Sequence, residues 1–327
     1  MAVATASTSE WFVVRSRCPA CDHPDSTTIL CQDYNDPAIR DYLTWFYSQQ
    51  GPGIEPTYLS GAEYKLEECA GCGLIYQEQV PGDELMVRLY ETWIDSDLAW
   101  QRHINKPRTP SFFGGYARDL LRLHQFLGAR PYQLQVLDFG MGWGNWCQMA
   151  HGFGCSVHGV EVSQARIDHA RRHGIPVLTH DRIADHQFDF IHTEQVFEHI
   201  PSPRNTLATL VSSLRPGGVI QLSVPNGTDI RSRLDSMDWR APKGSLLCIN
   251  AVAPLEHINC FNHHSLVALA ASQGLKPIRS LACGPRASRH QRILNALRRL
   301  RDAITGRWKR STFLFFQSPG EWTPASS

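Results

Sequence analysis

The segment Val136–Trp146, VLDFGMGWGNW, contains the residue types that most clearly point to chemistry. Its glycines Gly140, Gly142 and Gly144 let a chain turn sharply and bring its backbone close to a ligand. Asp138 lies two residues before the first glycine, where a carboxylate would repel a phosphate group. The segment therefore predicts a loop that approaches a positively charged ligand.

The spacing of these glycines differs from that of a dinucleotide-binding loop. That fingerprint is G-x-G-x-x-G, with a pyrophosphate at a helix N-terminus, and here the third glycine comes one residue early. Glu161 follows at the end of a second predicted strand, where a carboxylate can accept hydrogen bonds from both ribose hydroxyls. We therefore expect a nucleoside that carries an ammonium and a sulfonium group and no phosphate.

Acidic and histidine side chains follow two further predicted strands, at the edge of the sheet where a substrate would lie. They are Glu194, Glu198 and His199 in EQVFEH, and His257 in PLEHIN. In one interpretation, all four bind a divalent cation, Mg²⁺ or another, that lowers the pKa of a substrate hydroxyl. In the other, His199 or His257 alone is the general base and Glu198 ties down local backbone.

Two CxxC pairs near the N-terminus have the spacing of zinc ligands. They are Cys18 with Cys21 and Cys69 with Cys72, and four thiolates make a closed, structural Zn²⁺ site. Almost fifty residues separate the pairs, more than the about 15–20 of a compact ribbon, so we expect an inserted loop. Cys31 lies between the pairs, either as a substitute ligand or as a small buried side chain.

The elements that must position these residues are strands alternating with amphipathic helices. A helix ends at Gly128 after Tyr116, Leu120, Leu123 and Leu127 recur at helical spacing. Alternation of this kind predicts right-handed crossovers and a parallel sheet. The predicted strands of this part are Leu134–Phe139, Cys155–Glu161, Val177–Thr179, Phe188–Thr193 and Gly218–Val224.

Taken in order, these segments resemble the successive motifs of class I S-adenosylmethionine-dependent methyltransferases. The motifs are DFGMGWG at 138–144, GVE at 159–161, Asp181, FDFI at 188–191 and LRPGG at 214–218, and the resemblance covers roughly residues 113–320. It implies a Rossmann-like α/β fold with a seven-stranded sheet whose last strand is antiparallel. Lys276–Ala282 and Thr312–Gln317 would be the final two strands, with Leu266–Ser272 in the helix before them.

The same resemblance implies contacts to S-adenosylmethionine, which are made around the methionine part, the ribose and the adenine amino group. The implied cofactor-binding residues are Asp138, Phe139, Gly140, Gly142, Gly144, Glu161, Val162, Asp181 and Glu194. The E-x-x-E-H group with a distant histidine is similar to that of small-RNA 2′-O-methyltransferases and, in part, of ubiquinone-pathway O-methyltransferases. His263 and His264 mark only the start of a helix.

The N-terminal cysteines resemble the zinc-ribbon heads of bacterial methyltransferases that act on sugars and other secondary metabolites. We therefore expect a zinc-ribbon-like module at 1–80, a connecting segment at 81–112 and a class I methyltransferase domain at 113–327. A basic helical insertion interrupts that domain at about 286–310. This helix either packs its apolar stripe on its own domain and leaves its charges in solvent, or contacts an anionic membrane surface or a phosphorylated substrate through 292–310.

Bulk composition excludes a strong general field for nucleic acid or membrane, because the formal net charge is only +1. No apolar run approaches the about 18 residues of a membrane span, and the ten cysteines form no disulfide-like pattern, so we expect a cytoplasmic protein. The favoured function is biosynthetic methyl transfer to a sugar, lipid-linked or natural-product intermediate. The alternatives are an RNA methyltransferase and a non-catalytic cofactor-binding domain, and the sequence indicates no oligomeric state.

Overall fold

The computed structural model describes residues 10–105, 109–279, 281, 293 and 312–323, and the structural statements that follow concern these residues. The chain forms two compact units. The first unit comprises Met1–Lys106, Glu198–Pro201 and Gly227–Phe261, and the second comprises Pro107–Phe197, Ser202–Asn226 and Asn262–Ser327. None of the described helices is both long enough and apolar enough to cross a bilayer.

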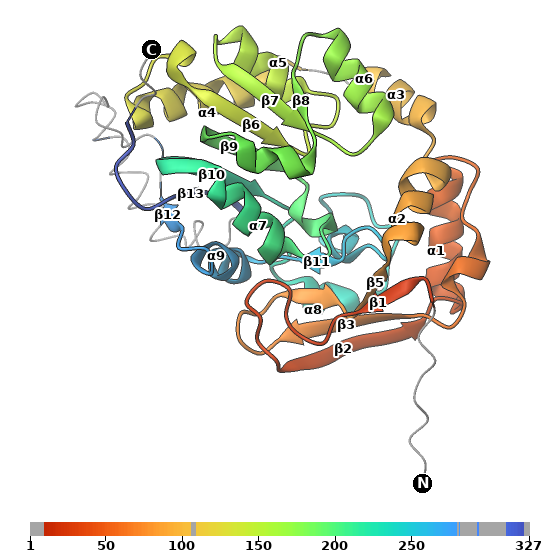
Figure 1. The fold of residues 1–327 in the computed structure, drawn as a ribbon. Helices are drawn as coiled ribbons and strands as arrows, with labels where there is room; N and C mark the ends of the chain where they lie inside the picture. Colours follow the sequence, from red (N-terminus) through yellow and green to blue (C-terminus); the bar gives the residue numbers. More distant parts are fainter. Residues whose placement is uncertain (1–9, 106–108, 280, 282–292, 294–311, 324–327) are drawn as a thin grey trace. The chain divides into compact units, whose positions relative to one another are not determined.

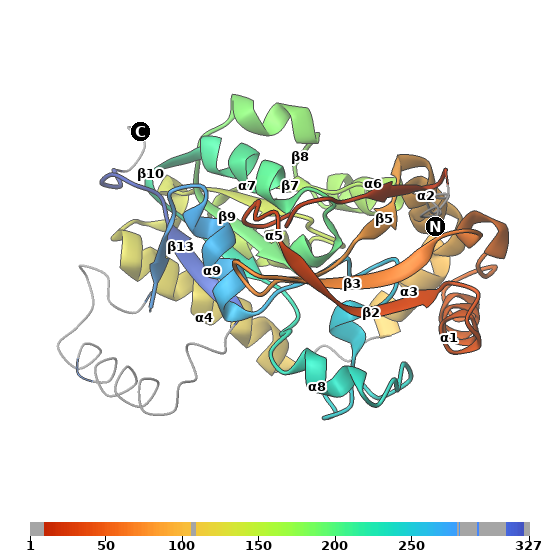
Figure 2. The same cartoon turned by 90° about the horizontal axis from the view of Figure 1, so that it is seen from below.

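The first unit is built on a small antiparallel sheet in the order β11-β4-β3-β2, beside the two-stranded sheet β1-β5 (Figure 1). Its strands are β1 (Phe12–Val14), β2 (Ser26–Asp33), β3 (Glu63–Cys69), β4 (Ile75–Gln77), β5 (Gln79–Pro81) and β11 (Asn259–Cys260). Its helices are α1 (Pro37–Ser48), η1 (Pro56–Leu59), α2 (Asp83–Arg88), η2 (Leu89–Trp93), α3 (Ser96–Asn105), α8 (Ile230–Leu234) and η6 (Asn250–Val252). Figure 2 shows β2 and β3 side by side.

An aromatic core holds residues that are distant in sequence together in this unit. Tyr47, Tyr64 and Trp93 are buried in it, and so is Val252, whose carbonyl accepts a hydrogen bond of 2.6 Å from Tyr64 Oη. Burying such large rings supplies most of the favourable energy in a unit of this size. The segment 227–261 therefore folds with the N-terminal residues, although it lies inside the stretch expected to be one 113–327 domain.

The second unit contains the seven-stranded sheet. Its strands are β6 (Gln135–Phe139), β7 (Ser156–Val160), β8 (Val177–Leu178), β9 (Phe188–Glu194), β10 (Leu214–Ser223), β12 (Lys276–Ile278) and β13 (Phe313–Gln317). Its helices are α4 (Pro110–Leu127), η3 (Pro131–Gln133), α5 (Asn145–Gly152), α6 (Gln164–Arg172), η4 (His180–Asp185), α7 (Pro203–Ser212) and α9 (His263–Ala271). The short η5 (Phe197–His199) runs from the second unit into the first.

The strand order of this sheet is β12-β13-β10-β9-β6-β7-β8, and β13 runs antiparallel to both of its neighbours. Strands β6 to β10 are parallel, as expected from their helical crossovers. Figures 1 and 2 show α4 on one side of the sheet and α7 on the other. The predicted Rossmann-like fold with seven strands is therefore confirmed, including its antiparallel strand.

Most predicted elements of the second unit agree with the structure to within a few residues. Gly128 ends α4 with a left-handed φ of 69°, and α9 begins at His263, where Asn262 Oδ1 accepts a hydrogen bond from Ser265 N. The predicted strand Lys276–Ala282 is shorter, because β12 ends at Ile278. The predicted basic insertion at about 286–310 lies outside the described residues except for Ile293.

Candidate functional site

The glycine loop after β6 turns where its glycines are required. Gly140 has a φ of 74°, and a Cβ atom built on it would lie 2.4 Å from Val196 Cγ2, so no larger residue fits. Gly142 has a φ of 55°, but its Cβ would meet no heavy atom within 4 Å. The loop is thus packed tightly on one side and open at Gly142, as a backbone that contacts a ligand requires.

Glu161, just after β7, holds this loop in place. Its Oε2 accepts a hydrogen bond of 2.9 Å from Gly142 N, and its Oε1 accepts bonds from the backbone N–H groups of Val162 and Ser163. Arg166 Nη1 lies 3.7 Å from Oε2. The structure therefore brings together the two predicted cofactor residues Gly142 and Glu161, at the carboxyl ends of neighbouring strands.

The other residues expected around the nucleoside lie near the same edge of the sheet. Val162 follows Glu161 directly in the chain and is 80% exposed. Asp181 is exposed at the start of η4, and its hydrogen bond with Thr179 lowers the pKa of its carboxyl. Phe139 is buried and its ring contacts His180 edge to face at 6.0 Å.

Asp138 faces the interior and is tied to a residue that the sequence analysis missed. Its Oδ1 lies 2.7 Å from His192 Nδ1, which donates to the carboxylate, and its Oδ2 accepts a bond of 3.4 Å from Cys147 Sγ. His192 is stacked on Trp146 with ring centroids 4.5 Å apart. The pairing of β6 with β9 places Asp138 opposite His192, a register that the sequence alone does not reveal.

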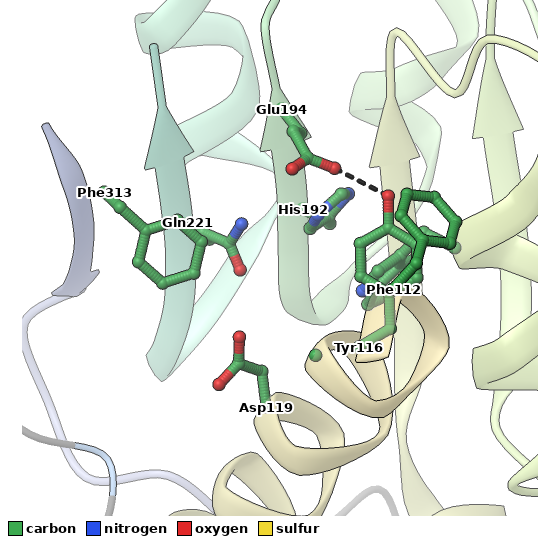
Figure 3. A pocket seen from close by; sticks show the side chains of 9 residues that line it. Phe112, Tyr116, Asp119, His192, Glu194, Gln221 and Phe313 are labelled. Carbon is green, nitrogen blue, oxygen red and sulfur yellow. Dashed lines mark hydrogen bonds between the residues drawn. The ribbon is translucent and has the colours of Figure 1, made fainter. Parts of the chain in front are cut away.

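Glu194, at the end of β9, accepts a hydrogen bond of 2.8 Å from Tyr116 Oη on α4 (Figure 3). Both residues line a cavity of about 200 Å³ between α4 and the sheet. Glu194 belongs to the second unit, whereas the other three residues of the predicted cation site belong to the first. The four predicted ligands are thus divided between the two units.

The remaining three, Glu198, His199 and His257, form a cluster in the first unit. One ligand atom from each lies within 4.8 Å of the others, and His199 Nε2 is 3.8 Å from Glu198 Oε1. Each histidine donates its Nδ1–H to a backbone carbonyl, His199 to Glu256 O at 2.8 Å and His257 to Asn250 O. These bonds place the proton of each ring on Nδ1, the arrangement found in histidines that bind metals through Nε2.

The segment before His257 has an unusual conformation. Leu255 is buried with a φ of 68°, which is uncommon for a residue with a side chain and costs of order 1–3 kcal/mol. Burial lowers the pKa of His257 to about 3, so its imidazole is neutral near pH 7. A neutral imidazole can bind a metal ion, whereas a pKa this low makes it a weak general base.

Arg15 fastens the same segment to the N-terminal strands. Its Nη1 donates to Asn259 Oδ1 at 2.7 Å, its Nη2 donates to Ile258 O at 2.8 Å, and its Nε donates to Gln77 O at 2.9 Å. Asn259 Nδ2 in turn donates to Ile200 O at 2.7 Å. The backbone beside His199 and that beside His257 are therefore joined through Asn259.

The four cysteines of the two CxxC pairs meet in the first unit. Their Sγ atoms all lie within 4.8 Å of one another, and the Cys18–Cys72 and Cys21–Cys69 distances are each 3.6 Å. Four thiolates at about 2.3 Å from a tetrahedral zinc ion would lie about 3.8 Å apart, so these residues fit Zn²⁺. Cys31 is exposed on β2 and is not one of the four.

Comparison with known proteins assigns a family to residues 113–280. A family model described as a methyltransferase domain matches residues 113–280, just over half of the chain. The ubiquinone biosynthesis O-methyltransferase of Maricaulis maris is 29% identical over 127 residues, covering 35% of this chain and 50% of that protein. The ubiquinone biosynthesis O-methyltransferase of Rhizobium rhizogenes is 32% identical over 111 residues, covering 31% of this chain and 45% of that protein. The chain spans about half the length of the curated relatives it matches.

Among solved structures, magnesium protoporphyrin IX methyltransferase from Synechocystis PCC 6803 with bound SAH is similar with a TM-score of 0.45 and 12% identity, covering 72% of this chain and all of that one. A TM-score of this size adds nothing to the assignment, which depends on the family match. That match includes the glycine loop, Glu161 and five parallel strands of the sheet. The chain therefore belongs to the methyltransferase domain family.

Proposed function

We propose that this protein transfers a methyl group from S-adenosylmethionine to a small-molecule acceptor in a biosynthetic pathway. The observation that carries the proposal is the pairing of an open glycine turn at Gly142 with the carboxylate of Glu161, which is bonded to that turn at 2.9 Å. A carboxylate at the position of Glu161 can bind ribose hydroxyls, and the carboxylate of Asp138 on β6 disfavours a pyrophosphate at the glycine turn.

Bound S-adenosylmethionine would supply an electrophilic methyl group on a sulfonium, so the protein's tasks are alignment and deprotonation. In our proposal Glu161 binds the ribose, the exposed Val162 packs against the adenine, and Asp181 accepts a hydrogen bond from the adenine amino group. Asp138 acts from inside the domain, because its carboxylate already bonds to His192 and Cys147. Its contribution is then the negative field behind the loop.

We further propose that Glu198, His199 and His257 bind a divalent cation that lowers the pKa of the acceptor group. Two imidazole nitrogens and one carboxylate are a ligand set that first-row transition metals prefer, whereas Mg²⁺ prefers oxygen ligands. The orientation of both histidines favours this hypothesis over a single histidine base. Glu194, assigned to the other unit, is left out of this ion site.

For Cys18, Cys21, Cys69 and Cys72 we propose a structural Zn²⁺ ion. All four ligand positions would be filled by thiolates, so the ion would have no place for a substrate. The hydrogen bond from Cys72 lowers the pKa of the Cys18 thiol, which favours the thiolate that zinc requires. Zinc would stabilise the same unit that carries the Glu198 cluster.

A small molecule is favoured over RNA as the acceptor, because the relatives named above are named for ubiquinone biosynthesis. The RNA alternative depends on the cysteine pairs, the E-x-x-E-H group and the basic segment at about 286–310, and that segment lies outside the described residues except for Ile293. RNA methylation predicts tight, strongly salt-dependent polynucleotide binding. A non-catalytic domain predicts cofactor affinity without turnover.

Calorimetry with S-adenosylmethionine and S-adenosylhomocysteine tests the proposed cofactor site. We expect Glu161→Ala to weaken both ligands at least about tenfold, because two hydroxyl hydrogen bonds to a charged group are lost. Asp168→Ala is the matched control, since this half-exposed carboxylate lies on α6 and bonds to Gln164 and Arg171 on the same helix. Unchanged affinity in Glu161→Ala would remove this residue from the ribose, and no binding to the wild type would remove the proposed function.

Metal analysis of the purified protein tests the two ion sites separately. We expect one tightly held zinc ion that Cys69→Ser removes and Cys31→Ser retains. Activity lost on mild chelation and restored by Mn²⁺ or Fe²⁺, but not in Glu198→Gln, would support the second ion. Full activity after mild chelation would leave a histidine base as the explanation.

A further inference from the structure

The cavity beneath α4 has walls of an unusual composition. Its lining comes from α4, from Trp146 on α5, and from strands β9, β10 and β13 (Figure 3). Figure 3 shows the carboxylate of Asp119 and the amide of Gln221 facing the same space, with the ring of Phe313 at its edge. Gln221 is only 3% exposed, so a buried amide lies in a largely aromatic chamber.

Negative charge dominates this cavity. Among the nine described residues that line it, Asp119 and Glu194 are carboxylates and none is lysine or arginine. Arg122 lies 3.1 Å from Asp119 Oδ1 and neutralises that carboxylate in part, with a side chain that is 40% exposed. Asp138 adds a further carboxylate behind His192. A cation inside the cavity would therefore meet more negative than positive charge.

Aromatic rings form much of the remaining wall, beside Gly115, His192 and Gln221. Phe112, Tyr116, Trp146 and Phe313 all line the cavity, and the rings of Phe112 and Tyr116 lie 5.2 Å apart at 65°. The faces of such rings carry partial negative charge and therefore attract organic cations. Carboxylates together with several ring faces are the features by which proteins bind ammonium groups.

We propose that this cavity binds the ammonium group of an amine-bearing acceptor. This inference depends on the proposed function, because it names the chemical class of the molecule that the methyltransferase domain would bind. Aromatic rings would surround the cation, Asp119 and Glu194 would balance its charge, and the Gln221 side-chain oxygen could accept an N–H. The Tyr116 hydrogen bond holds the Glu194 carboxylate at the cavity wall. An anionic acceptor would be excluded from this site.

Calorimetry of the 327-residue chain with choline tests the proposal, with 3,3-dimethyl-1-butanol as the uncharged analogue of the same shape. Each titration is made with and without saturating S-adenosylhomocysteine. We expect choline to bind the S-adenosylhomocysteine complex, and the uncharged analogue to bind at least about tenfold more weakly. We expect Asp119→Asn to weaken choline about tenfold, whereas Asp168→Asn, an exposed carboxylate on α6, leaves it unchanged.

Three outcomes would overturn the acceptor site: equal binding of choline and its uncharged analogue, unaltered choline binding in Asp119→Asn, or displacement of choline by S-adenosylhomocysteine. The last would show that the cation site belongs to the cofactor's own ammonium. The affinity of Asp119→Asn for S-adenosylhomocysteine reports whether the variant is folded. Failure of the wild type to bind S-adenosylhomocysteine would overturn the proposed function instead. In that case the choline titration made without S-adenosylhomocysteine would still test the cavity.

Discussion

Replacing Gly142 by alanine separates the conformational role of this glycine from its proposed role in binding. Its φ of 55° lies in the left-handed region, which costs a residue with a Cβ about 1–2 kcal/mol. Part of that cost is offset by about 0.4–1 kcal/mol, because alanine has less freedom in the unfolded chain. No heavy atom lies within 4 Å of the new Cβ, so no clash is added. We expect a loss of stability of about 1 kcal/mol.

The loss of cofactor affinity should be much larger than the loss of stability. The new methyl group would occupy the open space beside the backbone where the ligand is proposed to lie, so we expect S-adenosylhomocysteine to bind at least about tenfold more weakly, or about 1.4 kcal/mol. Gly174 is a matched control, because its φ is 75° and its Cβ would also meet no heavy atom within 4 Å. Gly174 follows α6, away from the glycine loop in sequence.

Two assays on both variants give the comparison, urea denaturation for the free energy of unfolding and calorimetry for the affinity. We expect Gly142→Ala and Gly174→Ala to lose similar stability, while only Gly142→Ala loses affinity. Wild-type affinity in Gly142→Ala would refute the placement of the ligand at this glycine. An equal loss of affinity in Gly174→Ala would show that the effect is general destabilisation.

Three further changes test other contacts. Urea denaturation should show that Gly140→Ala loses about 1–3 kcal/mol more free energy of unfolding than Gly142→Ala, because the new Cβ would lie 2.4 Å from Val196 Cγ2. Adding Val196→Ala to Gly140→Ala should recover part of that difference. Burial raises the pKa of Glu256 from 4.5 to about 7, so the first unit should lose stability as the pH rises from about 4.5 to about 7. Urea midpoints measured at a series of pH values should show this loss in the wild type and not in Glu256→Gln. Arg15→Met should weaken ion binding at the histidine cluster without releasing zinc, because the hydrogen bond from Arg15 to Asn259 is lost. Simultaneous loss of both metals in metal analysis would contradict this.

The local pattern of the sequence was enough for the fold of the second unit and for its family. Glycine turns, buried strands and helix ends depend on residues close together in the chain, so the loop at 138–144, the end of α4 at Gly128 and the start of α9 at His263 could be predicted. The two CxxC pairs are local as well, since each places two thiolates side by side. That the two pairs meet each other is a property of the folded chain.

Tertiary structure decided which distant side chains face one another. The register between β6 and β9 brings His192 to Asp138, and a shift by one residue would turn His192 to the other face of the sheet. The aromatic core of the first unit includes Val252 and Leu255, so His257 belongs to that unit, whereas Glu194 belongs to the second. The cavity beneath α4 exists only because a helix packs across three strands, and the periodicity of a single segment does not predict it.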